Sequence, residues 1–182
     1  MRFERAVRLR GGETVLLRSL RIDDAECVLS WMRRIMGESR NMMRYPDEVT
    51  LSVQREEENI REQECSARAL LIGAFLADEL VGTAHLAPIH PADRVRHRAG
   101  IGLSVTKAHW HKGIASVMMK VLVDTAKKCG YEQLELEVVA DNTRAIALYE
   151  RFGFQMIGRH PKAFKYRDDS YADLLSMMAE LK

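Results

Sequence analysis

The segment from residue 99 to residue 128 constrains the fold most, because a strand, a short basic loop and an amphipathic helix follow one another directly. The apolar run 99–105 predicts the strand. Beyond Gly113, apolar residues recur at helical spacing: Ile114, Val117, Met118, Val121, Leu122 and Ala126. The first N–H groups of such a helix lack intrahelical partners and lie at the positive end of the helix dipole. The junction therefore predicts a binding site for an anion.

The rest of the chain alternates further strands and helices. Strands are expected at 14–20, 67–76, 80–88, 133–139, 154–158 and 171–178, and helices at about 23–37, 51–64 and 142–152. The polar segment 37–50 contains Pro46 and predicts a loop that overhangs the body of the protein. This order predicts an α/β (α+β) fold in which about four helices flank a mixed, mostly antiparallel sheet of six to seven strands. For 182 residues we expect one domain, residues 1–182.

The composition argues against several classes of protein. Apolar residues make up 47% and charged residues 30%, which is typical of a globular chain. A net charge of +2, with the basic residues dispersed, argues against a nucleic-acid partner. Cys27, Cys65 and Cys129 form no CxxC pair, so we expect reduced thiols. Because no 18-residue apolar run and no signal peptide is visible, we expect no membrane partner and a cytoplasmic location.

A second unit, D141-N-T-R-A-I-A-L-Y-E-R-F-G-F154, follows one strand after the first. Together the two units resemble the GCN5-related N-acetyltransferases (the GNAT family), whose acetyl-CoA motif reads V-x-x-x-x-[RQ]-x-x-G-x-[GA]. Val105, Gly113 and Ala115 match that spacing, whereas Trp110 stands where the family has Arg or Gln. His111 also replaces a common glycine. The second unit matches the family pattern N-x-x-A-x-x-L-Y-x-x-x-G-F at every fixed position.

The resemblance implies a GNAT fold with acetyl-CoA as the acetyl-donor cosubstrate. It also implies that the strand 99–105 diverges from its neighbour, which frees its backbone to bind the pantetheine arm and the acetyl carbonyl. The residues expected to contact acetyl-CoA are Leu103, Ser104 and Val105 on the strand, His111, Lys112, Gly113, Ile114, Ala115 and Ser116 at the loop and helix, and Asn142 and Tyr149 in the second unit. Because most of these contacts use backbone N–H groups, the departures at Trp110 and His111 need not abolish binding.

Acetyl transfer to an amine calls for a base and an acid. An alkyl ammonium with a pKa near ~10 is only about one part in a thousand neutral at pH 7, so deprotonation is worth ~4 kcal/mol. Tyr149 is the predicted acid, since a phenol can protonate the departing thiolate. Glu137 is the predicted base, although Glu135 and Glu137 equally fit a pair of solvated carboxylates on one strand face. His85 and His97 are rival bases.

We expect no metal ion, because His109 and His111 have no nearby Cys or carboxylate to complete a tetrahedral site. We expect direct attack in a ternary complex by the primary amine of a small-molecule or amino-acid-like acceptor, since no cysteine lies near the anion site. Arg40, Arg44 and Tyr45 fit a carboxylate-bearing amine and fit an exposed loop equally well. The alternatives are a protein N-terminal acetyltransferase, similar to those of ribosomal proteins, and a non-catalytic acyl-CoA-binding sensor. Dimerisation is common in the family, so a homodimer is an open expectation.

Overall fold

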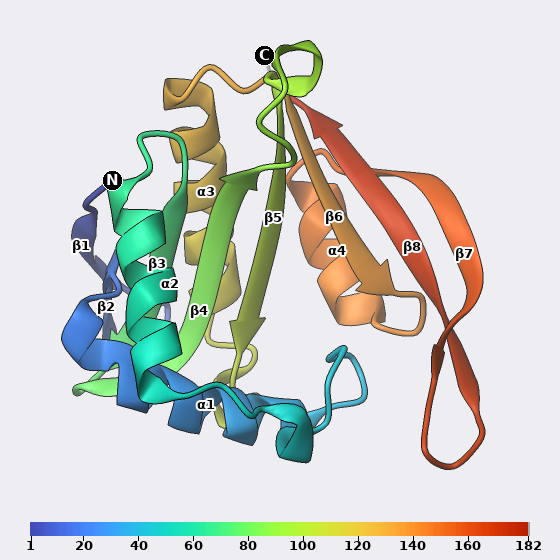
Figure 1. Cartoon of the computed structure of the whole chain (residues 1–182), viewed down its shortest axis with the longest axis horizontal. Helices are drawn as coiled ribbons and strands as arrows, with labels where there is room; N and C mark the ends of the chain where they lie inside the picture. Colours follow the sequence, from blue (N-terminus) through green and yellow to red (C-terminus); the bar gives the residue numbers. More distant parts are fainter. Residues whose placement is uncertain (182) are drawn as a thin grey trace.

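A computed structural model describes residues 1–181 and places eight strands in one sheet, in the order β1-β2-β3-β4-β5-β6-β8-β7 (Figure 1). The strands are β1 (Glu4–Arg8), β2 (Thr14–Ser19), β3 (Leu70–Leu76), β4 (Glu79–Pro88), β5 (Arg98–Val105), β6 (Gln133–Val139), β7 (Gln155–Lys165) and β8 (Tyr171–Glu180). Neighbouring strands pair antiparallel except β5 and β6, which run parallel. The predicted mixed, mostly antiparallel sheet is confirmed.

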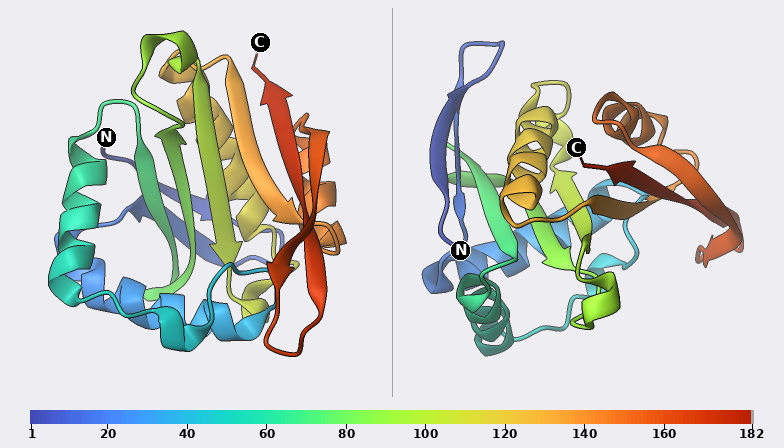
Figure 2. Two further views of the ribbon diagram at one scale, coloured as in Figure 1. Left: turned by 45° about the vertical axis from the view of Figure 1, so that its right-hand side comes forward. Right: turned by 90° about the horizontal axis from the view of Figure 1, so that it is seen from above.

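Four α-helices cover the two faces of the sheet (Figures 1 and 2). They are α1 (Ala25–Glu38), α2 (Val53–Cys65), α3 (Ile114–Lys128) and α4 (Thr143–Arg151). The face that carries α1 and α2 is called the front face below, and α3 and α4 lie on the opposite face. Short 3₁₀ helices lie in the connections: η1 (Ile22–Asp24), η2 (Pro46–Glu48), η3 (Asp93–Val95) and η4 (Lys107–His109).

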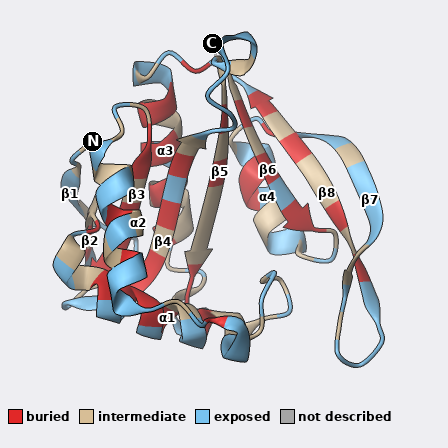
Figure 3. Ribbon diagram, viewed as in Figure 1, coloured by how far each residue is buried: buried red, intermediate tan, exposed pale blue. Residues whose placement is uncertain are grey.

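Each face of the sheet has its own core. Met118, Leu122 and Leu134 are fully buried between the sheet and α3. On the front face, Trp31 of α1 and Ile60 of α2 pack in a second apolar cluster. Full burial of one such side chain is worth roughly 1.5–3 kcal/mol, so the apolar helix faces hold the layers together. Figure 3 shows the resulting gradient, with β3 largely buried and the outer strand β7 exposed.

The sheet has one strand more than expected, because β1 leaves little trace in the sequence. Its text E4-R-A-V-R8 is mostly charged, and only Val7 is even half-buried. As an edge strand paired with β2 alone, it contributes backbone hydrogen bonds without an apolar run. β7 likewise continues past the expected end at residue 158 to Lys165, since its pairing with β8 resumes after two register shifts.

The parallel strands β5 and β6 separate along their length, as the family resemblance implied (Figure 1). They pair only at Arg98–Gln133, Ala99–Leu134 and Gly100–Glu135. Arg98 closes the narrow end of the resulting V, donating to the carboxylate of Glu135 at 2.5 and 2.8 Å. Beyond that point, the edge of β5 that faces β6 has no partner strand in the described chain, so its backbone groups are free to bind a ligand.

Candidate active site

The loop between β5 and α3 presents free N–H groups, as the sequence predicted. The first helical hydrogen bond runs from the N–H of Val117 to the carbonyl of Gly113, which leaves the N–H groups of Ile114, Ala115 and Ser116 at the open end of the helix. Gly113 is the N-cap residue and has φ +88°. A β-carbon there would meet no protein atom within 4 Å, so the loop surface in front of the helix is open.

Trp110, the least typical residue of the loop, has a structural role. Its indole Nε1 donates to the carbonyl of Val105 at 2.7 Å, which fastens the loop to the end of β5. The guanidinium of Arg144 lies over its ring, 3.3 Å from the centroid, and burial lowers the pKa of Arg144. Trp110 therefore joins the two units that the sequence singled out, since Arg144 belongs to α4.

His111 and Lys112, the two basic loop residues predicted to contact acetyl-CoA, have features that the sequence did not predict. His111 adopts φ +64°, a left-handed conformation that suits glycine, which gives a physical reason for the glycine common at this position. The ammonium of Lys112 lies 2.9 Å from the carboxylate of Glu13 in the β1–β2 connection. An incoming phosphate would compete with Glu13 for this cation. The sequence did not point to Glu13, because 99 residues separate it from Lys112.

Tyr149 lies in α4, on the face of the sheet opposite α1 and α2. Its ring is buried against Phe154, with centroids 5.9 Å apart. Burial raises the pKa of Tyr149 to about 12, so the hydroxyl stays protonated at neutral pH and can donate a proton. Asn142, predicted as a cofactor contact, caps α4: its Oδ1 accepts from the N–H of Ala145 at 3.3 Å. That hydrogen bond fixes the helix that carries Tyr149.

The structure separates the two carboxylates of β6. Glu135 is engaged by Arg98 at the narrow end of the V, so it does not form the solvated pair with Glu137 that one interpretation of the sequence suggested. Glu137 lies further along the strand and lines a large cavity. Of the rival bases, His97 lies at the narrow end, where its carbonyl accepts from the N–H groups of Glu132 and Gln133. His85 lies on β4, opposite Gly102 of β5.

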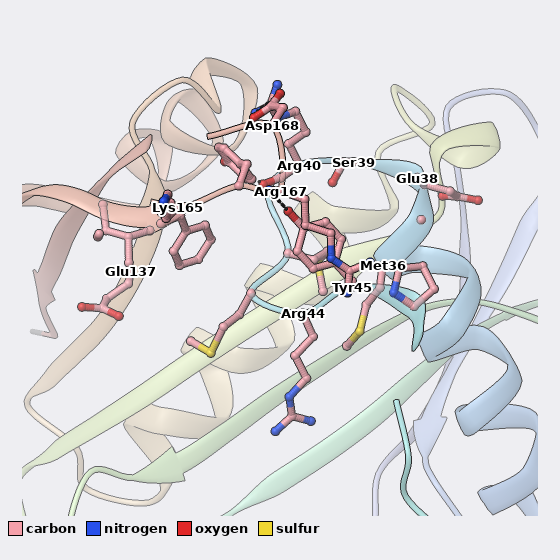
Figure 4. A pocket seen from close by; sticks show the side chains of 18 of the residues that line it. Met36, Glu38, Ser39, Arg40, Arg44, Tyr45, Glu137, Lys165, Arg167 and Asp168 are labelled. Atoms are coloured by element: carbon pink, nitrogen blue, oxygen red, sulfur yellow. Dashed lines mark hydrogen bonds and ion pairs between the residues drawn. The ribbon is translucent and has the colours of Figure 1, made fainter. Parts of the chain in front are cut away.

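The cavity beside Glu137 has a volume of about 930 Å³. One wall is the predicted overhanging loop after α1, and the other is the β7–β8 hairpin (Figure 4). Its apolar lining comes from both walls: Met36, Met42, Met43, Ala163, Phe164 and Leu174. Arg44, which the sequence indicated, is also among the lining residues, and its exposed side chain extends from the loop in front of the strands. A chamber of this size and lining suits a small organic ligand.

Two arginine–tyrosine pairs fasten the two walls to each other. Arg40 lies 4.0 Å above the ring of Tyr166, whose hydroxyl donates to the carbonyl of Arg40 at 3.0 Å. In reciprocal fashion, Arg167 lies 3.9 Å above the ring of Tyr45, whose hydroxyl accepts from the N–H of Arg167 at 2.8 Å. Arg167 also makes two hydrogen bonds to Asp47, at 2.7 and 3.0 Å. We call the contacts of Arg40, Tyr45, Tyr166 and Arg167 the clasp.

Two of the four clasp residues were not predicted from the sequence. Arg40 and Tyr45 were indicated by the sequence, whereas Tyr166 and Arg167 lie between the predicted strands 154–158 and 171–178, where no site residue was predicted. The segment F164-K-Y-R167, which is rich in aromatic and basic residues, could have indicated them. Among residues 1–181, no group of three or more His, Cys, Asp or Glu side chains is arranged to hold a metal ion. Within the same range, no helix is long and apolar enough to cross a membrane.

The V-shaped gap, the open helix N-terminus and the buried tyrosine are the features that the family resemblance predicted. The chain belongs to the acetyltransferase (GNAT) family, whose model matches residues 32–154. The recognition made from the two sequence motifs is thereby confirmed.

Solved structures share the fold, and curated relatives share part of the sequence. A GNAT-family acetyltransferase from Streptococcus pneumoniae superposes with a TM-score of 0.86 at 22% identity, covering 91% of this chain and 99% of that one. YncA from Salmonella typhimurium, solved with its cofactor acetyl-CoA, superposes with a TM-score of 0.80 at 17% identity, covering 92% and 94%. The L-amino acid N-acetyltransferase AaaT of Escherichia coli is 29% identical over 85 residues, which is 46% of this chain and 52% of AaaT. The matched segments span between 18% and 53% of the curated relatives.

Proposed function

We propose that this protein is an acetyl-CoA-dependent N-acetyltransferase that acts on a primary amine of a small, amino-acid-like acceptor by direct attack in a ternary complex. One observation carries the proposal: β5 loses its partner strand, and the loop 106–113 then leads from its end to the open N-terminus of α3. A free strand edge binds an extended amide-containing chain, and a helix N-terminus binds a diphosphate. The residues present therefore fit coenzyme A. Bound acetyl-CoA would supply the activated acetyl group.

The roles of the residues follow from their places around the gap. The backbones of Leu103, Ser104 and Val105 would hold the pantetheine arm and the acetyl carbonyl, and the loop from His111 to Ser116 would hold the diphosphate. Tyr149, protonated at neutral pH, would donate to the thiolate from the face opposite α1 and α2. Glu137 would attract the acceptor ammonium from the cavity and remove a proton from it.

The acceptor class is argued from charge in the cavity. Of the three arginines that line it, Arg40 is paired with Asp168 and Arg167 with Asp47. Arg44 makes no ion pair with any of residues 1–181, so its guanidinium is available for a ligand carboxylate. An amino acid fits these features. Its carboxylate would bind Arg44, its amine would lie at Glu137, and its apolar side chain would pack between the loop and the β7–β8 hairpin.

The two alternatives make different demands on the same site. A protein N-terminal acetyltransferase needs an open groove for a peptide chain, whereas the clasp links both walls of the cavity. A non-catalytic sensor has no need of a buried, protonated tyrosine at the acid position of the family motif, and Tyr149 is present. Both observations support a small-acceptor enzyme.

A CoA-release assay over a panel of simple amines, free amino acids, amino acid amides and short peptides tests the proposal. We expect free amino acids to be the preferred class. Arg44→Ala should raise the KM of an amino acid while leaving the KM of its amide unchanged, since the amide has no carboxylate. Faster release with peptides would support the protein N-terminal alternative. Release with none of the amines, while acetyl-CoA still binds, would support the sensor.

Two further proposals concern the cellular location and the oligomeric state of the protein. Cys27, Cys65 and Cys129 are all free thiols, which suits the proposed cytoplasmic location. A homodimer is proposed through the edge strand β7, where Met156 and Ile157 are 61% and 59% exposed. Light scattering of the wild-type protein and of a Met156→Lys variant tests the dimer, which the variant should dissociate.

A further inference from the structure

The proposed function leaves one proton transfer without an assigned residue. The nitrogen of an alkyl ammonium carries three hydrogens and the amide nitrogen of the product carries one, so two protons leave the nitrogen in each turnover. Glu137 can hold only one proton at a time. A second proton acceptor on the side from which the acceptor approaches would let both protons leave without Glu137 first passing one to solvent.

His85 lies on that side of the sheet. It pairs with Gly102 of β5, and two directly paired residues point to the same face. Ser104, which shares this face of β5, lies with its Oγ 3.8 Å from the sulfur of Met42 in the overhanging loop. Glu137 also shares the face, because Gly100 pairs with Glu135 and alternate residues of a strand point the same way. His85 and Glu137 thus stand on opposite sides of β5.

The ring of His85 occupies the space where a side chain at residue 102 would lie. A β-carbon built at Gly102 would be 2.4 Å from Cε1 of His85 and 3.1 and 3.2 Å from its two ring nitrogens. Gly102 is not among the glycines with positive φ, so the glycine is required for space and not for backbone conformation. The imidazole consequently reaches across to β5, at the stretch of the strand that has lost its β6 partner.

The surroundings of His85 favour its neutral form. The side chain is exposed to solvent on the front face, and the ring also lies against the backbone of β5 at Gly102. Desolvation by the neighbouring protein lowers the pKa of His85, which favours the uncharged imidazole with a free lone pair. The charged groups on this face of the adjoining strands are Arg98 and Glu135, which pair with each other, and Glu137. The neighbour on β3 is the apolar Leu71.

We propose that His85 accepts the proton that the acceptor nitrogen loses as the C–N bond forms, and that Gly102 is the positioning residue that admits the ring. This inference rests on the proposed function. In each turnover the C–N bond forms and the thioester C–S bond breaks. Two protons pass from the nitrogen to Glu137 and His85 and then to solvent, while Tyr149 delivers one proton to the sulfur and regains one from solvent.

A double-mutant cycle on the full chain tests both parts of the proposal. His85→Ala should lower kcat by ~10²-fold with the affinity for acetyl-CoA unchanged, which is the usual size of a general-base contribution. Gly102→Ala should lower kcat by at least about tenfold, because its methyl group displaces the ring. In the His85→Ala background, Gly102→Ala should have no further effect on kcat. The matched control is Gly100→Ala, whose β-carbon would meet only Ile89 at 3.9 Å and which should retain wild-type kcat.

Chemical rescue separates a proton-accepting role from a structural one. Added imidazole should restore part of the kcat of His85→Ala, and should restore less in the double variant, where the methyl group at residue 102 fills the vacated space. Thermal melting and acetyl-CoA titration confirm that each variant is folded.

Two results would overturn the inference while leaving the proposed function intact: His85→Ala within twofold of wild-type kcat, or Gly102→Ala equally harmful in both backgrounds. If the folded wild-type protein binds acetyl-CoA and acetylates no amine of the panel, the proposed function itself fails. The two failures are therefore distinguishable, because the second is seen without any variant.

Discussion

The guanidinium of Arg144 lies 3.3 Å from the ring centroid of Trp110, and this contact joins the anion-binding loop to the helix that carries Tyr149. The same indole donates a hydrogen bond to the carbonyl of Val105. The side chain that departs most from the family motif is thus a link between the two halves of the site. We therefore expect Trp110 to act on binding indirectly, through the position of the loop.

Substitution of Trp110 separates its two contacts. Trp110→Phe removes the indole N–H and should cost about 1 kcal/mol of unfolding free energy, since the Val105 carbonyl loses its partner. Trp110→Ala also removes the cation–π contact, worth about 0.5–1 kcal/mol more, and should weaken acetyl-CoA binding by about tenfold. Urea unfolding and calorimetric titration measure both quantities. Equal binding by all three proteins would show that the loop holds its conformation without Trp110.

His111→Gly tests whether the imidazole contacts the cofactor. Because His111 has φ +64°, glycine should be tolerated there and should stabilise the fold by up to about 1 kcal/mol. If only the backbone binds the diphosphate, the affinity for acetyl-CoA should be unchanged. A clear loss of affinity in a protein of undiminished stability would assign a direct contact to the side chain.

Tyr149→Phe should lower turnover by ~10²-fold while acetyl-CoA binding is kept, because only the hydroxyl is lost. Undiminished turnover would remove Tyr149 as the acid. The raised pKa also makes a prediction about stability: the folded state holds the phenol proton more tightly than the unfolded state. That contribution is fully present below pH 10 and is lost as pH rises toward 12, by about 2–3 kcal/mol. Unfolding measured between pH 8 and pH 11.5 should show this fall in the wild type and less of it in the phenylalanine variant.

Glu137→Gln should lower kcat/KM and change the shape of its pH profile, because a group that removes the ammonium proton has been replaced by an amide. Glu135→Gln is the matched control on the same strand face, since Glu135 is engaged by Arg98 and does not line the cavity. The control should lower the melting temperature without altering the profile. An unchanged profile in Glu137→Gln would remove Glu137 as the base.

Arg167→Ala should loosen the clasp, since it removes the guanidinium contacts with Tyr45 and Asp47 and leaves only the backbone hydrogen bond to the Tyr45 hydroxyl on that side. We expect the acceptor KM to rise severalfold, with the affinity for acetyl-CoA and the melting temperature nearly unchanged, because the ion pair is exposed. Arg159→Ala is the control: Arg159 pairs with Asp173 on the same hairpin and does not line the cavity. If both variants change the acceptor KM equally, the effect belongs to the hairpin as a whole.

Local sequence was sufficient for the half of the site that is proposed to bind the cofactor. Two short segments form it: Gly113 with the helix that follows, and Asn142 with the helix that it caps. In each segment the hydrogen bonds join residues that are close in the sequence. The strand β1 and the full length of β7 were not predictable in the same way. Edge strands bury one face at most, so periodicity is weak there.

The sequence by itself determined the family, the strand–loop–helix that offers N–H groups to an anion, and the tyrosine of the second unit, because each depends on neighbours along the chain. The tertiary structure alone decided what surrounds the cavity proposed for the acceptor. Tyr45 meets Arg167 across 122 residues, and the His85 ring lies over Gly102 only because β4 and β5 pair in one register. Such contacts depend on strand order and register. Packing of the whole core selects both, so a local sequence pattern cannot predict them.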